Sequence, residues 1–324
     1  MNNLTFEQFN NAEFKLFEGN PIIKNPLESF VIADPSVLTP DISHDGKWHL
    51  FCHTFFGVYR YESDNGVDFT NKGKIVNRAM RPNINYINGK YYLFFERTRS
   101  VIFNLLSLVG AQWRSEIYCV ESTDFKSWSE PYRVIGKTRE YEEYNKGYAI
   151  SNPFLINVDG KYRMYYSCGQ TFIDDCGFCE PTHISFAESE NVTTGFVSRE
   201  TPIISPDKTK EYLNLCSGCL KVYKLKDCYI GLQNGLYEKE PAKNAAGEYI
   251  YKFSVEGQEG YYDSYQGAKD KVDALEAADE TKAYEVNMKI KAAAIQSVNG
   301  SNEANWKVAN TETWYKELPA KFSE

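Results

Sequence analysis

Several features are missing from this sequence, and each absence excludes a class of protein. The 324 residues contain no apolar run of about 18 residues, so we expect no membrane-spanning helix. The N-terminus has no basic region followed by an apolar one, which argues against a secretory signal peptide. The net charge is −8 and no basic cluster occurs, so no nucleic-acid partner is predicted. Gly-rich phosphate loops and dinucleotide fingerprints are also missing.

The eight cysteines indicate the compartment more than they indicate a metal. Without a signal peptide, reduced thiols in the cytoplasm are expected. Two Cys-x-x-Cys pairs, Cys176/Cys179 and Cys216/Cys219, have the ligand type and spacing of a zinc site. However, a spacing of three residues on a strand would place Cys216 and Cys219 on opposite faces. Buried thiols are therefore the preferred interpretation, and neither a metal nor another cofactor is predicted.

Aromatic residues are abundant and organised in a repeat. Tyr and Phe number 24 and 20, which favours strands. Four times, an apolar strand turns over on a short polar hairpin and returns as an aromatic-rich strand. The copies are Ser36–Thr54, Asn83–Thr98, Pro153–Cys168 and Gly218–Asn234. Repeated strand hairpins of this kind are typical of a β-propeller, in which each copy begins one blade.

A third strand follows each of the first three hairpins. These strands are Val58–Asp64, Ile117–Asp124 and His183–Glu190, and each contains a Glu-Ser pair. The recurrence of this pair predicts a structural role in hydrogen bonding between blades. A strand near Tyr249–Val255 would close the fourth blade.

The C-terminal part does not continue the repeat. We expect the propeller to occupy residues 1–262 and an atypical segment to occupy residues 263–324. Residues 266–298 are rich in Ala, Lys, Glu and Asp, with apolar residues at helical spacing, which predicts a helix. The fold class is therefore all-β, with a C-terminal segment that is helical in part.

The direction of the hairpins places many polar residues on one face of the propeller. All the hairpin turns lie on one face, so the starts of the first strands and the ends of the second strands lie on the other. Two long loops, Thr98–Ser115 and Gly169–Pro181, reach the same face. Polar groups beside apolar strands predict a pocket there. The residues gathered on that face are Asp34, His53, Arg81, Asn83, Glu96, Arg97, Asn152, Asp175, Glu180 and Gln233.

Over residues 20–237 the chain resembles the five-bladed propeller glycoside hydrolases, and family 43 most of all. The resemblance rests on Ala33-Asp34-Pro35-Ser36-Val37, on the Gly-Lys-aromatic hairpins and on the Glu-Ser strands. It implies a five-bladed propeller with Asp34 as the general base. The family's second-blade Asp falls at Arg81-Pro82-Asn83, and its third-blade general acid falls at Ser151-Asn152-Pro153. An amide cannot donate the proton that a leaving oxygen needs.

Another residue must therefore supply the acid. Glu180 and Glu96 are equally good candidates from the same face, and the adjacent Asp174-Asp175 could raise one another's pKa. His53 is a further option. Ordinary structural roles are open too: Asp34 could cap a strand entry, and Glu96 could form a buried ion pair with Arg97 or Arg99.

These residues predict an exo-acting, inverting glycoside hydrolase that cleaves a small oligosaccharide. Asp34 and either Glu180 or Glu96 are the candidate catalytic residues. The candidate substrate-binding residues are Arg81, Asn83, His53, Arg97, Asn152, Asp175 and Gln233. Two alternatives stay open: a non-catalytic carbohydrate-binding propeller, and a glycoside phosphorylase that uses a cationic cluster of Arg81, Arg97 and Arg99. The oligomeric state is not predicted.

Overall fold

The chain divides into two compact units, residues 1–237 and 238–324. The computed structural model describes residues 4–98, 113–144, 147–173, 178–207, 213–236, 242–243, 249–250, 253–255, 265–278 and 286–288. Most of residues 238–262 lie outside these ranges, so the boundary expected after residue 262 stays a prediction.

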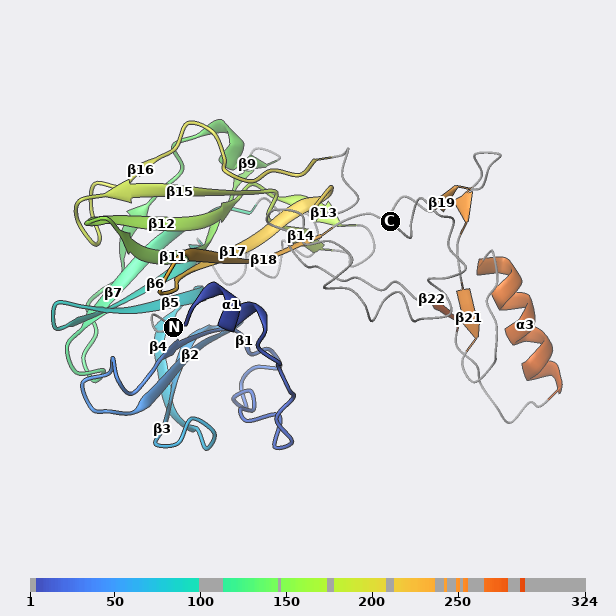
Figure 1. The fold of residues 1–324 in the computed structure, drawn as a ribbon, viewed down its shortest axis with the longest axis horizontal. Helices are drawn as coiled ribbons and strands as arrows, with labels where there is room; N and C mark the ends of the chain where they lie inside the picture. Colours follow the sequence, from blue (N-terminus) through green and yellow to red (C-terminus); the bar gives the residue numbers. More distant parts are fainter. Residues whose placement is uncertain are drawn as a thin grey trace. The chain divides into compact units, whose positions relative to one another are not determined.

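Among its described residues the first unit has three four-stranded antiparallel sheets and a long two-stranded sheet, with two shorter two-stranded sheets in the connections (Figure 1). The first sheet is β1 (Ala33–Leu38), β2 (Trp48–Thr54), β3 (Gly57–Ser63) and β4 (Thr70–Asn77). The second is β5 (Ala79–Ile87), β6 (Lys90–Thr98), β7 (Ser115–Ser122) and β8 (Tyr132–Ile135). The third is β11 (Ile150–Val158), β12 (Lys161–Cys168), β15 (His183–Ser189) and β16 (Val197–Ser198), and the last is β17 (Cys216–Lys224) with β18 (Tyr229–Leu236).

Each sheet pairs its strands in chain order, as a propeller blade does. The four hairpins and the three third strands expected from the sequence are thus confirmed. The described residues do not confirm a count of five blades. Short elements fill the connections: α1 (Phe6–Asn10), a 3₁₀ turn (Glu140–Glu142), and the pairs β9 (Glu143–Tyr144) with β10 (Gly147–Tyr148) and β13 (Thr171–Ile173) with β14 (Phe178–Glu180).

Two-residue turns set the register of the second and third sheets. Asn88 and Gly89 have φ angles of 50° and 80°, and Asp159 and Gly160 have 51° and 87°. Positive φ at both positions is the type I′ geometry, which matches strand twist and favours Asn-Gly or Asp-Gly. The local sequence therefore specifies the turns that the structure contains.

The Glu-Ser pairs act within single sheets. The lysine of the hairpin turn binds the glutamate of the third strand, Lys47 Nζ to Glu62 Oε1 at 3.2 Å and Lys90 Nζ to Glu121 Oε2 at 2.7 Å. The serine caps the following bend: Ser122 Oγ accepts backbone N–H groups two and three residues ahead at 3.3 and 3.0 Å. The prediction that these pairs bond one blade to the next is therefore wrong.

The sheets pack face to face, and the second sheet is buried on both sides. Leu93 and Phe95 on β6 pack with Phe51 of the first sheet, whereas Phe94 packs with Met164 of the third. Successive side chains on a strand point to opposite faces, so a strand in this position must be apolar throughout. This explains the continuous aromatic run of the second hairpin.

A β-bulge recurs near the start of the first strand of each four-stranded sheet and of the β17–β18 sheet. The strand register shifts between Ala33/Ser36, Met80/Asn83, Ser151/Phe154 and Cys216/Cys219. Within each bulge one residue has positive φ: 49° at Asp34, 51° at Arg81, 50° at Asn152 and 63° at Gly218. This conformation is uncommon outside glycine. Because β1 contacts β5, β5 contacts β11 and β11 contacts β17, the bulges follow one another along adjacent first strands.

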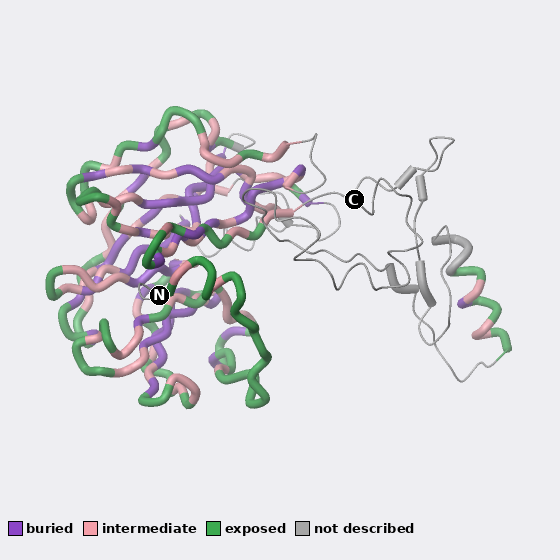
Figure 2. The backbone as a smooth tube through the Cα atoms, in the orientation of Figure 1, coloured by how far each residue is buried: buried purple, intermediate pink, exposed green. Residues whose placement is uncertain are grey.

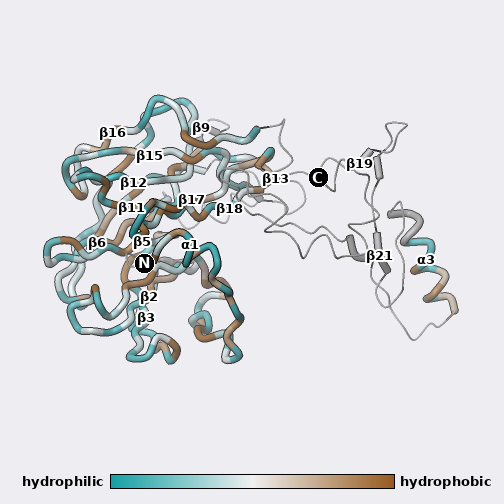
Figure 3. The backbone as a smooth tube through the Cα atoms, in the orientation of Figure 1, coloured by the Kyte–Doolittle hydropathy of each residue, from teal (hydrophilic) through white to brown (hydrophobic). Residues whose placement is uncertain are grey.

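The N-terminal segment is anchored at one end and exposed along its length. The Lys226 backbone N–H donates to the Leu4 carbonyl at 2.9 Å, and the Phe6 N–H donates to Asp227 Oδ1 at 3.0 Å. Between α1 and β1 the chain is mostly exposed, although it carries hydrophobic stretches (Figures 2 and 3). Phe14 and Leu16 are among its exposed apolar side chains.

The second unit contains only part of the helix that was expected over residues 266–298. The helix α3 (Tyr265–Ala278) is present, with Val272 buried, which confirms the start of the expected helical region. Residues further along form a strand, β22 (Val286–Met288), paired with β21 (Phe253–Val255). A strand was also expected over Tyr249–Val255, and within the second unit β20 (Tyr249–Ile250) pairs with β19 (Ala242–Lys243) while β21 pairs with β22. Its place in the fourth blade stays a prediction. No helix among the described residues is long and apolar enough to cross a membrane.

Gly218→Ala should destabilise the protein far more than Gly46→Ala. A Cβ at Gly218 would lie 1.9 Å from the Asn234 carbonyl oxygen, whereas at Gly46, which also has positive φ, it meets nothing within 4 Å. Positive φ alone costs an L residue about 1–2 kcal/mol. We expect urea unfolding to show about that loss for Gly46→Ala and at least about 4 kcal/mol for Gly218→Ala. Equal losses of unfolding free energy in the two variants would contradict the close approach of the Asn234 carbonyl to Gly218.

Candidate functional site

Asp34 lies in the bulge of β1, and its carboxylate faces two groups. Its Oδ2 is 3.3 Å from His53 Nδ1 and 3.9 Å from Arg81 Nε. The Asp34 side chain is 45% exposed, so a ligand or water can reach it. Burial lowers the pKa of His53 to about 4, helped by Arg81 and opposed by Asp34. The imidazole is therefore neutral near pH 7. Its Nδ1 accepts the Arg81 backbone N–H at 3.3 Å, so His53 lies beside Asp34 without adding a charge.

Arg81, in the bulge of β5, is held between carboxylates. Its Nη1 forms an ion pair with Glu96 Oε2, and Glu96 is completely buried near the end of β6. The other Glu96 oxygen accepts the Trp113 indole N–H at 3.0 Å. Burial acts to lower the pKa of Arg81, but the charges of Glu96, Asp34 and Glu180 outweigh it and raise the pKa. The guanidinium is thus a fixed cation that pairs with Glu96, lies 3.9 Å from the Asp34 carboxylate and responds to the charge of Glu180.

Glu180 reaches this region from a different part of the chain. It ends β14, where it pairs with Thr171 in a short hairpin. Burial raises the pKa of Glu180, the Arg81 charge lowers it and the Asp34 charge raises it, and the net shift is upward. Glu180 therefore lies within electrostatic range of both Asp34 and Arg81. Its carboxyl group holds a proton to higher pH than an ordinary glutamate does.

Two residues expected in the pocket have other partners. Asn83 is buried, and its Oδ1 accepts the Leu155 backbone N–H at 2.9 Å and the Asn85 amide at 2.8 Å. It therefore ties the second sheet to the third. Arg97 stacks over the Tyr118 ring at 5.5 Å instead of flanking Glu96. Burial and the Arg78 charge lower the pKa of Arg97. Adjacent strand residues point to opposite faces, which separates Arg97 from Glu96.

Two of the remaining expected residues, Asn152 and Gln233, lie in or beside a bulge. Asn152 occupies the bulge of β11, and its amide donates to Ser151 Oγ at 3.3 Å. Gln233 Nε2 donates to the Ser217 carbonyl at 2.9 Å beside the bulge of β17. Asp175 lies outside the described residues. The roles expected for these residues stay predictions.

Two residues of β17 belong to this neighbourhood and were not expected there. Burial raises the pKa of Cys219, and the charges of Lys221, Asp34, Arg81 and Glu180 all act on it. Its Sγ donates to Asn234 Oδ1 at 2.8 Å. Lys221 Nζ donates to the Pro35 carbonyl at 3.4 Å, next to Asp34. If Gly218 had been aligned with Asp34, Arg81 and Asn152 in the repeat, the sequence would have placed Cys219 and Lys221 near the candidate site.

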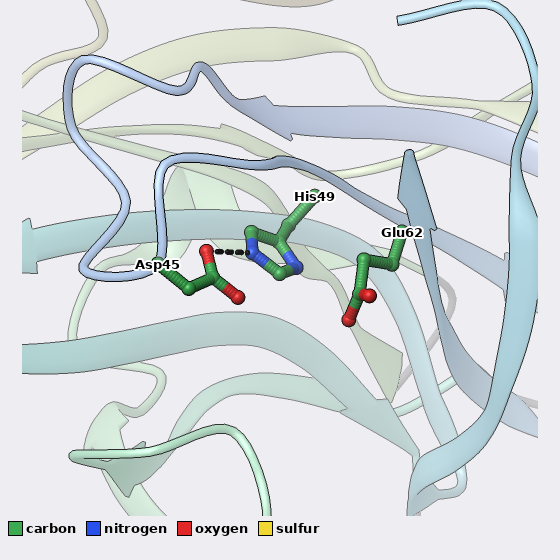
Figure 4. Close-up of side chains that lie close together, drawn as sticks. All are labelled: Asp45, His49 and Glu62. Carbon is green, nitrogen blue, oxygen red and sulfur yellow. Dashed lines mark hydrogen bonds and ion pairs between the residues drawn. The ribbon is translucent and has the colours of Figure 1, made fainter. Parts of the chain in front are cut away.

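A separate cluster of Asp45, His49 and Glu62 lies in the first sheet (Figure 4). Its ligand atoms lie within 4.8 Å of one another, but protein groups already occupy them. His49 Nε2 binds Asp45 Oδ1 at 2.8 Å, and its Nδ1 accepts from Arg60 at 2.9 Å. Glu62 binds Lys47 and Arg60, each at 3.2 Å. Lys72 also pairs with Glu62, at 3.4 Å. A metal ion would have to displace these three cations, so the cluster is an ion-pair network.

Comparisons with known proteins address the fold. No protein-family model matches the sequence, and no curated protein is similar to it. An endo-1,4-β-xylanase from Bacteroides thetaiotaomicron matches in structure with a TM-score of 0.50 and 16% identity, covering 72% of this chain and 76% of the xylanase. The chain shares the fold of that enzyme.

Other structural matches are weaker. A thermostable family-43 glycoside hydrolase has a TM-score of 0.33 at 18% identity, over 59% of this chain and 79% of that one. A family-43 arabinoxylan arabinofuranohydrolase from Bacillus subtilis has a TM-score of 0.44 at 13% identity, and the match covers 68% of this chain and 49% of the arabinofuranohydrolase. It is the match to the xylanase that confirms, for the fold, the resemblance to glycoside hydrolases expected from the repeats.

Glu96→Gln should destabilise the protein strongly. Glutamine can still accept from Trp113, but it leaves Arg81 without its buried ionic partner. Breaking a buried ion pair costs about 3–5 kcal/mol, and we expect the lower end because Arg81 is partly exposed. The control is Glu116→Gln, whose partner Arg133 is exposed and which should cost at most about 1 kcal/mol. Chemical denaturation measures both, and a loss no greater than the control's would rule out a structural ion pair.

Glu180→Gln should make the protein more stable at neutral pH. A glutamate whose folded pKa is raised stabilises the fold below its unfolded pKa and loses that contribution as pH rises through the folded pKa. Ionised Glu180 is therefore unfavourable above the ordinary value of 4.5, and glutamine removes that cost.

Urea unfolding of wild type and variant across pH tests this. The gain should be largest near pH 7 and should shrink towards zero below the ordinary glutamate pKa. The exposed Glu190→Gln is the control and should show no such trend. A gain independent of pH, or no gain at all, would contradict the raised pKa.

Proposed function

We propose that this protein is an exo-acting, inverting glycoside hydrolase that cleaves an oligosaccharide. The observation that carries the proposal is the convergence of Asp34 and Glu180, from two separate segments, on the Arg81 guanidinium. Hydrolysis of a glycosidic bond needs one carboxylate and one protonated carboxyl group around the bond. The partly exposed Asp34 suits the first role, and Glu180, with its raised pKa, suits the second.

In the proposed reaction, Glu180 donates its proton to the leaving glycosidic oxygen as the bond to the anomeric carbon breaks. Asp34 takes a proton from a water molecule that attacks the opposite side of the same carbon. The water oxygen forms the new bond, so the product sugar has the inverted anomeric configuration. The Arg81 guanidinium attracts the Asp34 carboxylate and so helps to hold it in position for this step.

The contacts of the two candidate acids favour Glu180. Both carboxylate oxygens of Glu96 are occupied, one by Arg81 and one by Trp113, and the side chain is completely buried. A group enclosed in this way cannot reach a leaving oxygen. We therefore assign Glu96 a positioning role: it fixes Arg81, and Arg81 acts on both Asp34 and Glu180.

The same contacts favour hydrolysis over phosphorolysis. The phosphorylase alternative requires Arg81, Arg97 and Arg99 to act together on a phosphate. Arg81 is paired with carboxylates, and Arg97 lies over Tyr118. Arg99 lies outside the described residues. Because Asp34 and Glu96 compensate the positive charge of Arg81, a neutral sugar is a better substrate for this site than an anionic one.

Asp34→Asn and Glu180→Gln should each lower kcat/KM by about 10²–10⁴-fold, because each removes one proton-transfer group. Glu180→Gln should be milder on aryl glycosides with acidic phenol leaving groups, which need little protonation. Asp34→Asn should be equally severe on all of them. A panel of chromogenic glycosides, with Glu190→Gln as the unaffected control, measures these effects.

Three results would contradict the proposal. One is full activity in both variants. Another is a product anomer, followed by proton NMR during turnover, that keeps the substrate's configuration. The third is saturable oligosaccharide binding with no release of sugar in the wild type, which would support a carbohydrate-binding propeller instead.

A further inference from the structure

A cavity of about 380 Å³ lies between the second and third sheets, away from Asp34 and Glu180. It is formed where β5 and β11 end, at the hairpin turns, whereas Arg81 and Asn152 lie where these strands begin. Arg81 and Ile87 are six residues apart on β5, which corresponds to about 20 Å along a strand. The cavity is therefore separate from the candidate active site.

The lining is polar but uncharged. Tyr86, Tyr162 and three asparagines, Asn85, Asn88 and Asn157, contribute to it, and none of the lining residues is acidic or basic. Within the described part of the chain, the hydroxyls of both tyrosines and the Asn88 amide make no hydrogen bond to another residue. These groups are available to a ligand that both donates and accepts hydrogen bonds.

Other contacts make the cavity rigid before any ligand binds. The Asn85 amide donates to Asn83 Oδ1 at 2.8 Å, and Asn157 Oδ1 accepts the Gly160 N–H at 3.2 Å. The Tyr86 ring packs on Tyr91, with ring centroids 4.5 Å apart. A preformed wall lowers the entropy cost of binding, because few side chains need to be ordered.

We propose that this cavity is a second binding site, and that it takes a neutral saccharide. Amide and phenol groups suit the hydroxyls of a sugar, which donate and accept at once, and tyrosine rings suit its apolar faces. The absence of charge in the lining disfavours an anionic or cationic ligand, which would have to leave water without a compensating partner. The volume falls within the range of about 300–1,000 Å³ that small-molecule sites occupy.

The site would hold a saccharide about 20 Å from the reacting groups. One chain of sugar units could therefore be anchored at one end of β5 and β11 while another is processed at the other end. The proposal needs no catalytic activity at Asp34, so it stands independently of the proposed hydrolase.

Two variants each remove one group from the lining of the cavity. Asn88→Gly removes the amide but keeps the positive φ that the turn requires. Tyr162→Ala removes one ring of the lining. Tyr229→Ala is the control, because Tyr229 is an exposed tyrosine of another hairpin and does not line the cavity. All three are made in the full chain that also carries Asp34→Asn, so that the saccharide is not consumed.

Binding of neutral trisaccharides (xylotriose, cellotriose and maltotriose) is measured by titration calorimetry and by chemical-shift changes. We expect at least one to bind, and both cavity variants to weaken that binding at least tenfold while Tyr229→Ala leaves it unchanged. Hydrolysis of a small aryl glycoside by the same variants with Asp34 restored should be unaffected, which separates this site from the proposed active site. No saturable binding, or binding unaffected by both cavity variants, would overturn the proposal.

Discussion

A left-handed residue in a β-bulge, repeated near the start of β1, β5, β11 and β17, is the constraint on which the candidate site depends. Each bulge interrupts the ladder and turns one residue out of the regular alternation. In three sheets that residue has a polar side chain, Asp34, Arg81 or Asn152, and in the fourth it is Gly218. Holding a residue other than glycine at positive φ is unfavourable, and such strain persists where the surrounding structure enforces it. Here the packed sheets enforce it.

Charge compensation then gives the gathered residues different properties. The charge of Arg81 alone would lower the pKa of nearby carboxyl groups, but the negative charges of Glu96 and Asp34 compensate it. Burial is therefore the largest influence on the pKa of Glu180, and it raises that pKa. In the proposed reaction the buried Glu96 transfers no proton itself, but it fixes the cation that acts on Asp34 and Glu180, the two groups proposed to do so.

The sequence predicted the elements better than the contacts between them. Hairpins, third strands and the position of Asp34 follow from a repeat whose turn residues and alternation are local. Spacing could not separate Glu180 from Glu96, because occupancy by Arg81 and Trp113 is a tertiary property. The strand β22 within an Ala- and Lys-rich region shows pairing overriding helix propensity. The neighbour expected beside Glu96, Arg97, lies over Tyr118 because strand alternation separates the two.

The central claim is that Glu180 and Asp34 interact electrostatically as an acid and a carboxylate around Arg81. The most direct measurement is the carboxyl carbon-13 NMR titration of Glu180 in the wild type and in Asp34→Asn. Burial and the Asp34 charge both raise the pKa of Glu180, so it should exceed the ordinary 4.5 in the wild type and fall when Asp34 is neutralised. A Glu180 pKa at the ordinary value, or one that does not respond to Asp34→Asn, would contradict the account.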